Sequence, residues 1–163
     1  MKRSVVLILC LVLLLAAACG RQEAVSEADM EQPVKFYYCQ TGEAETYENE
    51  TGALAWELRD LGPERLKAAA ILELYLKGPE TDGLRSPFPS GLEVEETQLQ
   101  NGILTVTFSE ELDKLTGIRK TRAAACLVYT LTEFADIKAV QLDGWESPLT
   151  REDFLLSGDI LGE

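Results

Sequence analysis

Apolar residues in the second half of the chain recur at intervals of three and four, which predicts a helix between residues 116 and 136. The repeating positions share one helical face, which is expected to pack on a sheet. They are Ala124, Leu127, Val128, Leu131 and Ala135. Thr116 is expected to be the N-cap, because its hydroxyl can accept a hydrogen bond from the first turn. Asp136 is expected to end the helix.

Alternation of apolar and polar residues, the period of a strand, occurs both before and after this helix. The predicted strands cover residues 34–39, 53–61, 92–99, 104–108 and 139–143. In the second strand, Leu54, Trp56 and Leu58 are expected to face the core. Glu57 and Arg59 would then face solvent, because successive side chains of a strand point to opposite sides.

A second helix is expected at residues 66–76, where alanine and leucine dominate. Pro63 suits its first turn, where proline is favoured. Gly78 can adopt the left-handed conformation that ends many helices, and Pro79 prevents continuation. This helix is apolar over so much of its surface that both of its sides are expected to be covered.

The remaining segments read as turns and loops. Residues 81–91 contain two prolines and are expected to form a loop. Asn101 and Gly102 are typical of a tight hairpin, and the segment after Gly144 is expected to add a short strand or a packed tail. The order β-β-α-β-β-α-β predicts an α+β fold, a two-layer sandwich of two helices on one face of a small mixed sheet.

The first 18 residues have the pattern of a secretory leader: a basic head, an apolar run and small residues before Cys19. Spanning a membrane takes about 20 apolar residues, and this run is shorter. Alanines before Cys19 and Gly20 after it resemble a bacterial lipobox, which implies a lipid on Cys19 and a lipid-anchored protein outside the cytoplasm. The alternative is an ordinary signal peptide with an incidental cysteine. Residues 19–32 are expected to form the anchor and a flexible tether, and residues 33–163 one domain.

Charge and composition exclude several classes of function. The formal net charge is −13, which argues against nucleic-acid partners because like charges repel. The chain contains no histidine, which excludes Ser-His-Asp and Cys-His catalysis and His-ligated zinc. We therefore expect no catalytic residue, no metal and no cofactor.

Two cysteines remain in the domain, Cys39 and Cys126. Outside the cytoplasm such a pair can form a disulfide. The alternative is two separate thiols, because Cys126 is expected on the side of its helix away from the apolar face, and Cys39 ends a strand. Two thiols alone cannot supply a four-ligand metal site.

Two acidic clusters suggest chemistry at first sight. The first comprises Glu43, Glu45, Glu48 and Glu50. It lacks the Asp/Asn and glycine spacing of a calcium loop and is expected to be solvated. The second comprises Glu110, Glu111 and Asp113. Glycoside cleavage needs two carboxyl groups facing each other across a cleft, whereas adjacent glutamates leaving a strand point apart.

Aromatic and basic residues offer candidates for binding. Tyr37 and Trp145 are candidates for stacking on sugar rings or contacting a partner. Trp56 is expected in the core instead. Arg85 is expected either to anchor its own loop, which we favour, or to contact a partner.

Several segments together resemble the GerMN domain, named from spore-germination lipoproteins of endospore-forming bacteria. They are VKFYY, LELYLKGP, GLRSPFPSGLEV, LTVTFSEEL and VYTLTEFADIKAVQLDG, in this order. The last, which ends in Asp143-Gly144, is the most specific. The resemblance implies a non-catalytic extracytoplasmic domain, similar in fold to the ring-building modules of sporulation channels. This chain carries one such domain, whereas the namesake proteins carry two.

Two hypotheses of function from different classes fit these observations. The first is a membrane-anchored interaction or scaffold module that binds a protein partner at the cell envelope, in sporulation or spore germination. The second is a module that binds cell-wall glycan, such as peptidoglycan, or another small ligand. An enzyme that uses carboxylates alone is the third alternative.

Overall fold

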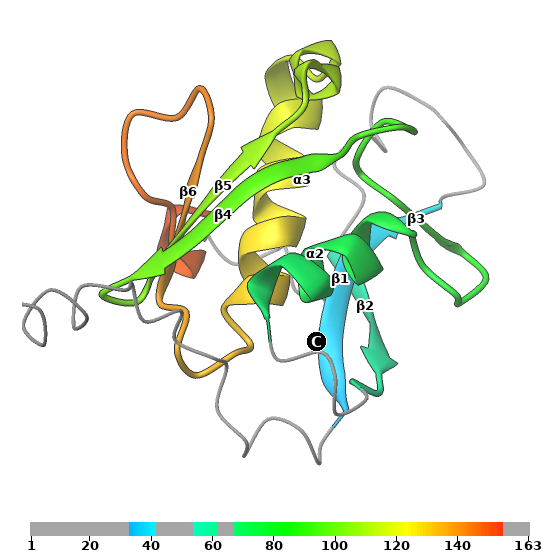
Figure 1. The fold of residues 1–163 in the computed structure, drawn as a ribbon. Coiled ribbons are helices and arrows are strands. Elements are labelled where there is room, and N and C mark those ends of the chain that lie inside the picture. Colours follow the sequence, from blue (N-terminus) through cyan, green and yellow to red (C-terminus); the bar gives the residue numbers. More distant parts are fainter. Residues whose placement is uncertain (1–32, 42–53, 62–66, 155–163) are drawn as a thin grey trace, which may run out of the picture.

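The computed structural model describes residues 33–41, 54–61 and 67–154 (Figure 1). The leader, Cys19, the tether, the acidic loop at residues 43–50, Pro63 and the last nine residues lie outside this part, so the expectations for them stay predictions. No helix within the described residues is long and apolar enough to cross a membrane.

The first sheet has three antiparallel strands in the order β2-β1-β3. Its central strand β1 covers Val34–Gln40, and β2 covers Leu54–Arg59. The third strand, β3, has only two residues, Leu84–Arg85, and lies in the segment expected to be a loop. Leu84 pairs with Gln40 of β1, so a short ladder forms before the two prolines.

The second sheet has the order β4-β5-β6. Strands β4 (Val94–Gln100) and β5 (Ile103–Phe108) form an antiparallel hairpin, and β6 (Ala139–Leu142) runs parallel to β5. The hairpin turns at Asn101 and Gly102, both with positive φ, which confirms the prediction for this turn.

The α+β class is confirmed, but the strands form two small sheets instead of one. The first sheet ends at β3 and the second begins at β4. The segment between them contains Pro87 and Pro89, which lack the backbone N–H that a ladder needs. Helix α2 (Ala68–Leu76) packs on β4, and α3 (Gly117–Leu131) packs on β1 and β6.

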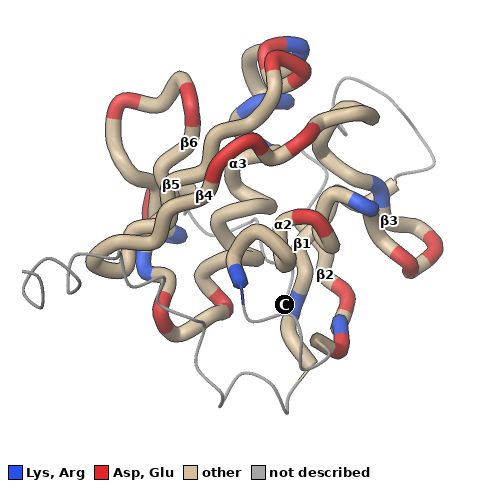
Figure 2. Tube along the Cα trace, viewed as in Figure 1, with Lys and Arg blue, Asp and Glu red and all other residues tan. Residues whose placement is uncertain are grey.

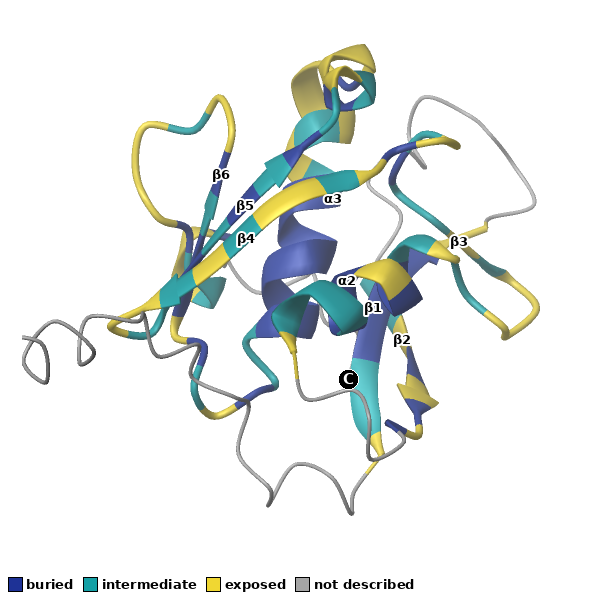
Figure 3. Cartoon of the chain, in the orientation of Figure 1, coloured by how far each residue is buried: buried dark blue, intermediate teal, exposed yellow. Residues whose placement is uncertain are grey.

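Helix α3 lies at the centre of the molecule and is almost completely covered along its second half (Figure 3). Every residue from Ala123 to Leu131 is buried, because β1 covers one side and β6 with the short 3-10 helix η5 (Arg151–Phe154) covers another. Cys126 is therefore fully buried, and its expected place on an uncovered side of the helix is wrong.

The ends of α3 differ in detail from the prediction. Thr116 is the N-cap residue, but its hydroxyl makes no capping hydrogen bond. The helix ends at Leu131, before Asp136. Arg151 stabilises this end, because its guanidinium donates to the Tyr129 carbonyl at 2.9 Å and to the Thr132 hydroxyl at 2.7 Å. A cation is favourable where the helix carbonyls lack partners.

A buried network of hydroxyls joins the central strand to both helices. The Tyr37 backbone N–H donates to the Thr130 hydroxyl at 2.9 Å, and this hydroxyl donates to the Cys126 carbonyl at 2.8 Å. From α2, the Tyr75 hydroxyl donates to the Tyr37 carbonyl at 2.8 Å, and its ring stacks on Tyr38 with centroids 4.9 Å apart. The position of β1 between the helices is thereby fixed by polar contacts as well as by packing.

Beyond β6 the chain forms a packed tail. Leu149 pairs with Val140 in an isolated bridge, and Phe154 of η5 is buried. The sequence predicted either a short strand or a packed tail here, and the structure has a single bridge followed by a packed 3-10 turn.

Candidate functional site

Strand β2 is inverted relative to the prediction. Glu57 and Arg59 are buried, at 6% exposure each, whereas Trp56 is 47% and Leu58 54% exposed. Alternating exposed and buried positions along β2 are visible in Figure 3. The expectation that Trp56 and Leu58 face the core is therefore wrong: the polar face of this strand points inward and the apolar face outward.

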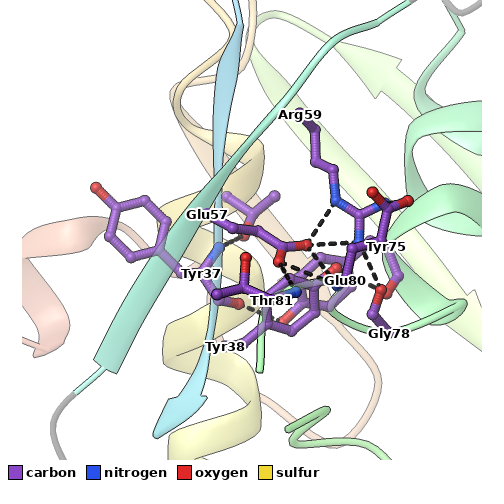
Figure 4. A network of polar contacts seen from close by, with 9 residues as sticks. Tyr37, Tyr38, Glu57, Arg59, Tyr75, Gly78, Glu80 and Thr81 are labelled. Carbon is purple, nitrogen blue, oxygen red and sulfur yellow. Dashed lines mark hydrogen bonds and ion pairs between the residues drawn. The ribbon is translucent and has the colours of Figure 1, made fainter. Parts of the chain in front are cut away.

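A closed set of polar contacts explains the inversion (Figure 4). The Glu57 carboxylate pairs with Arg59 at 2.5 Å and accepts the backbone N–H groups of Glu80 at 3.0 Å and Thr81 at 2.8 Å. Arg59 also donates to the Glu80 carboxylate at 2.7 Å and to the Gly78 carbonyl at 2.8 Å. Both charges that β2 brings into the interior thus have partners, which burial of a charged group requires.

This network also shifts the ionisation of Glu57. Burial alone would raise its pKa, but the hydrogen bonds from Thr81, Glu80 and Arg59 outweigh burial and hold the pKa below its ordinary value. Glu57 therefore stays ionised at neutral pH and ties β2 to the turn that follows α2.

The outer face of β2 exposes two large apolar side chains, Trp56 and Leu58. Only one other large apolar side chain within the described residues is exposed, and it is Ile118 of α3. The Lys35 ammonium lies 4.6 Å from the centre of the Trp56 ring. Among the described strands β2 pairs only with β1, so its other edge has backbone groups without a strand partner.

A second feature lies at the other end of the same sheet. Cys39 of β1 is paired in register with Arg85 of β3, and Arg119 and Arg122 of α3 line the same cavity of about 100 Å³. The Arg85 side chain is exposed, and it makes no hydrogen bond or ion pair to another described side chain. The sequence prediction that it anchors its loop therefore gains no support from these contacts.

Cys39 and Cys126 are both buried free thiols that contact each other. A hydrogen bond with Cys126 and the nearby guanidinium groups of Arg122 and Arg85 lower the pKa of Cys39 to about 7 despite its burial. Burial raises the pKa of Cys126 well above its ordinary value. Of the two alternatives left open by the sequence, the structure holds free thiols, yet it brings them together.

The aromatic candidates are mostly structural. Tyr37 is 6% exposed, with its ring 5.3 Å from the ring of Tyr129. This burial makes Tyr37 unavailable for stacking on a sugar. Trp145 is half-buried and packs edge-to-face on Phe154 at 6.5 Å. Trp145 thus keeps part of its surface in solvent.

The acidic residues before α3 do not face each other across a cavity. Glu110, Glu111 and Asp113 lie in one 3-10 helix, η4 (Glu110–Lys114), and Glu111 pairs with Lys114. No cluster of three or more His, Cys, Asp or Glu side chains within the described residues could hold a metal ion. A shallow hollow of about 460 Å³ between α2 and β4 is lined by no aromatic ring.

Sequence reasoning missed two features: the outward apolar face of β2 and the arginines beside Cys39. The first carried a weak signal, because Glu57 and Arg59, two apart on a strand, share a face and can pair. The second carried none, because residues 39, 85, 119 and 122 come from three separate elements.

Comparison with known proteins agrees with the fold. A family model described as Germane, sporulation and spore germination, matches residues 35–144. The first GerMN domain of the sporulation protein GerM from Bacillus subtilis is 20% identical, with a TM-score of 0.58 over 74% of this chain and 98% of that one. The tandem GerMN domains of the same protein are 17% identical, with a TM-score of 0.55 over 74% of this chain and 46% of that one. This chain thus spans about half of the tandem structure.

No curated protein matches this sequence. Identities of 17% and 20% show a shared fold and nothing more. The family model covers well over half of the chain, and this protein therefore belongs to the Germane family of sporulation and spore germination.

Proposed function

We propose that this protein is a lipid-anchored module outside the cytoplasm that works by binding another protein, in sporulation or spore germination. The leader and Cys19 support the anchor, and the family supports the process. The domain acts by recognition and not by catalysis, since the chain has no histidine and its acidic side chains before α3 do not oppose each other.

The observation that carries this proposal is the inverted strand β2. Burial of Glu57 with Arg59 directs Trp56 and Leu58 into solvent. An apolar strand face on a monomer exposes area that association would remove from water, at about 25 cal/mol per Å². Tryptophan is also among the residues that contribute most to protein interfaces.

The partner that fits this surface is an extended protein segment with apolar side chains at alternate positions. Such a segment can add a strand to the edge of β2 that no described strand pairs with, and backbone hydrogen bonds would then give affinity. Its alternate side chains would then lie beside Trp56 and Leu58, which occupy the same face two residues apart.

Binding to cell-wall glycan is the competing function. Sugar stacking needs exposed aromatic rings around a concave surface. Tyr37 is buried, and the hollow between α2 and β4 has no aromatic lining. Two candidates remain: Trp145 lies against Phe154, and the Trp56 ring on the outer face of β2 lies under the Lys35 ammonium. Protein binding through β2 is thus the better supported function.

Site-specific crosslinking in native membranes tests the proposal. A photoreactive amino acid replaces Leu58 in the full chain, and a matched variant carries it at Gln98, an exposed position on β4. Light is expected to produce a discrete protein adduct from position 58 and not from position 98. Mass spectrometry then identifies the partner and its crosslinked segment.

Two results would reject the proposal. One is equal adduct formation from both positions, which means that β2 is not a special contact. The other is the absence of protein adducts together with retention of peptidoglycan fragments on the purified chain, which favours the glycan function.

A further inference from the structure

Three arginines converge on one small cavity in a strongly acidic protein. The chain has 28 acidic and 15 basic residues, and acidic positions are spread along the described parts of the chain (Figure 2). The cavity is nevertheless lined by Arg85, Arg119 and Arg122 together with Cys39, and none of its lining residues in the described part of the chain is acidic. This cavity therefore has a local excess of positive charge, which suggests that it binds an anion.

Two elements hold these arginines in place. Arg85 belongs to β3, directly opposite Cys39 of β1. Arg119 and Arg122 lie three residues apart in the first turns of α3, so they share one side of the helix. The amino end of this 15-residue helix adds partial positive charge from its free N–H groups.

One of the guanidinium groups has a buried donor without an acceptor. Nη2 of Arg122 is inaccessible to solvent and has no hydrogen-bond partner among the residues that the structure describes. The ion pairs within the described residues involve Arg59, Lys114 and Arg151, and none involves the three arginines of the cavity. A buried unsatisfied donor costs about 1–3 kcal/mol, and more when it is charged. Arg122 also lines the cavity, so its guanidinium is held beside it with no carboxylate partner within the described residues.

From these contacts we infer that the cavity is a binding site for a phosphate group. Guanidinium forks match the oxygens of phosphate and carboxylate. Three of them carry more positive charge than one carboxylate can neutralise, whereas inorganic phosphate or a phosphate monoester carries up to two negative charges and a phosphodiester carries one. The volume of about 100 Å³ holds an anion of this size, since one water takes about 30 Å³ in the liquid.

Cys39 supplies a reporter inside the proposed site. The positive charges of Arg122 and Arg85 contribute to its lowered pKa. A phosphate bound to the same arginines cancels part of that field and raises the pKa of the Cys39 thiol. Alkylation of Cys39 at neutral pH should therefore slow when the site is filled, because the thiolate is the reactive form.

Equilibrium dialysis of the full chain against inorganic phosphate tests the inference, at constant ionic strength adjusted with sodium chloride. Saturable binding is expected, and phosphate is expected to slow alkylation of Cys39. Arg122→Gln is expected to weaken binding at least about tenfold, as for other hydrogen bonds to charged groups. Lys77→Gln is the matched control, because Lys77 is exposed and remote from the cavity, and it should bind as the wild type does.

Further arms distinguish the source and the class of the anion. Glycerophosphoglycerol represents the phosphodiester of a lipid headgroup, and acetate represents a carboxylate. Binding of inorganic phosphate or of the diester, lost in Arg122→Gln, supports the site and tells free phosphate from a headgroup. Equal binding of acetate overturns the preference for phosphate. If neither phosphate probe binds, the site itself is overturned. The same holds if Arg122→Gln and Lys77→Gln lose phosphate binding equally while their circular dichroism is unchanged.

Discussion

Replacing Glu57 by glutamine tests whether the buried polar network determines the orientation of β2. The amide has nearly the same shape as the carboxylate, but it leaves the buried Arg59 guanidinium without its counter-charge. Removing one member of a buried ion pair costs about 3–5 kcal/mol. We expect about 3 kcal/mol for Glu57→Gln, because the amide oxygen still accepts one backbone hydrogen bond from the turn after α2.

The same network contains the control. Glu80 also pairs with Arg59, but its side chain is 78% exposed, compared with 5% for Glu57. Exposed ion pairs contribute about 0–1 kcal/mol, so Glu80→Gln should lower the free energy of unfolding by less than about 1 kcal/mol. Urea denaturation, with midpoints compared at equal slope, gives both values.

The difference should also depend on pH. Because the folded-state pKa of Glu57 lies below its unfolded value of about 4.3, its stabilising contribution is complete above that pH. It is lost as the pH falls through the folded-state pKa. The gap between wild type and Glu57→Gln should therefore shrink in acid. A loss below 1 kcal/mol for Glu57→Gln, or an equal loss for Glu80→Gln, would refute the reasoning.

Three further changes have defined outcomes. Thr130→Val leaves the buried Tyr37 N–H without its acceptor and should lower the free energy of unfolding by about 1–3 kcal/mol in urea denaturation. Gly144→Ala forces a side chain into a conformation with φ of 73° and should cost about 1–2 kcal/mol by the same assay. Alkylation by iodoacetamide, followed by mass spectrometry, should modify Cys39 with a rate that rises through pH about 7, and Cys126 much more slowly. A loss below about 0.5 kcal/mol would contradict the prediction for Thr130→Val. An unchanged denaturation midpoint would contradict the one for Gly144→Ala, and equal alkylation rates of Cys39 and Cys126 would contradict the third.

Sequence periodicity predicted elements whose pattern is local. Helix α3 has apolar residues at three- and four-residue spacing, and the hairpin turn has Asn101-Gly102, so both could be found without knowledge of their neighbours. The end of α3 could not, because it depends on Arg151, which lies twenty residues beyond Leu131 in the sequence.

Strand β2 shows why the rest escaped prediction. Alternation reveals which residues share a face, but it does not reveal which face is buried when both can be satisfied. The apolar set of Leu54, Trp56 and Leu58 favoured one orientation. The opposite orientation occurs because Glu57 finds two backbone N–H groups at Glu80 and Thr81, contacts between residues far apart in the chain.

The cavity beside Cys39 escaped prediction for the same reason, because its residues are far apart in the sequence. Cys39 and Cys126 were recognised as a pair, but the arginines around Cys39 became visible only through the register of β1 with β3 and the packing of α3 on β1. Burial of Cys126 likewise reflects coverage of α3 on more than one side, which a single apolar stripe does not indicate.

Complementation in the source organism tests the central claim, that the outward face of β2 carries the function, most directly. A strain that lacks the protein receives the wild-type chain, the double variant Trp56→Ser with Leu58→Ser, or the control Glu96→Ser with Gln98→Ser on the exposed face of β4. With equal levels of the three proteins in the cells, the account predicts that the wild type and the control restore heat-resistant spores and their germination, whereas the β2 variant does not. Full restoration by the β2 variant would contradict the account.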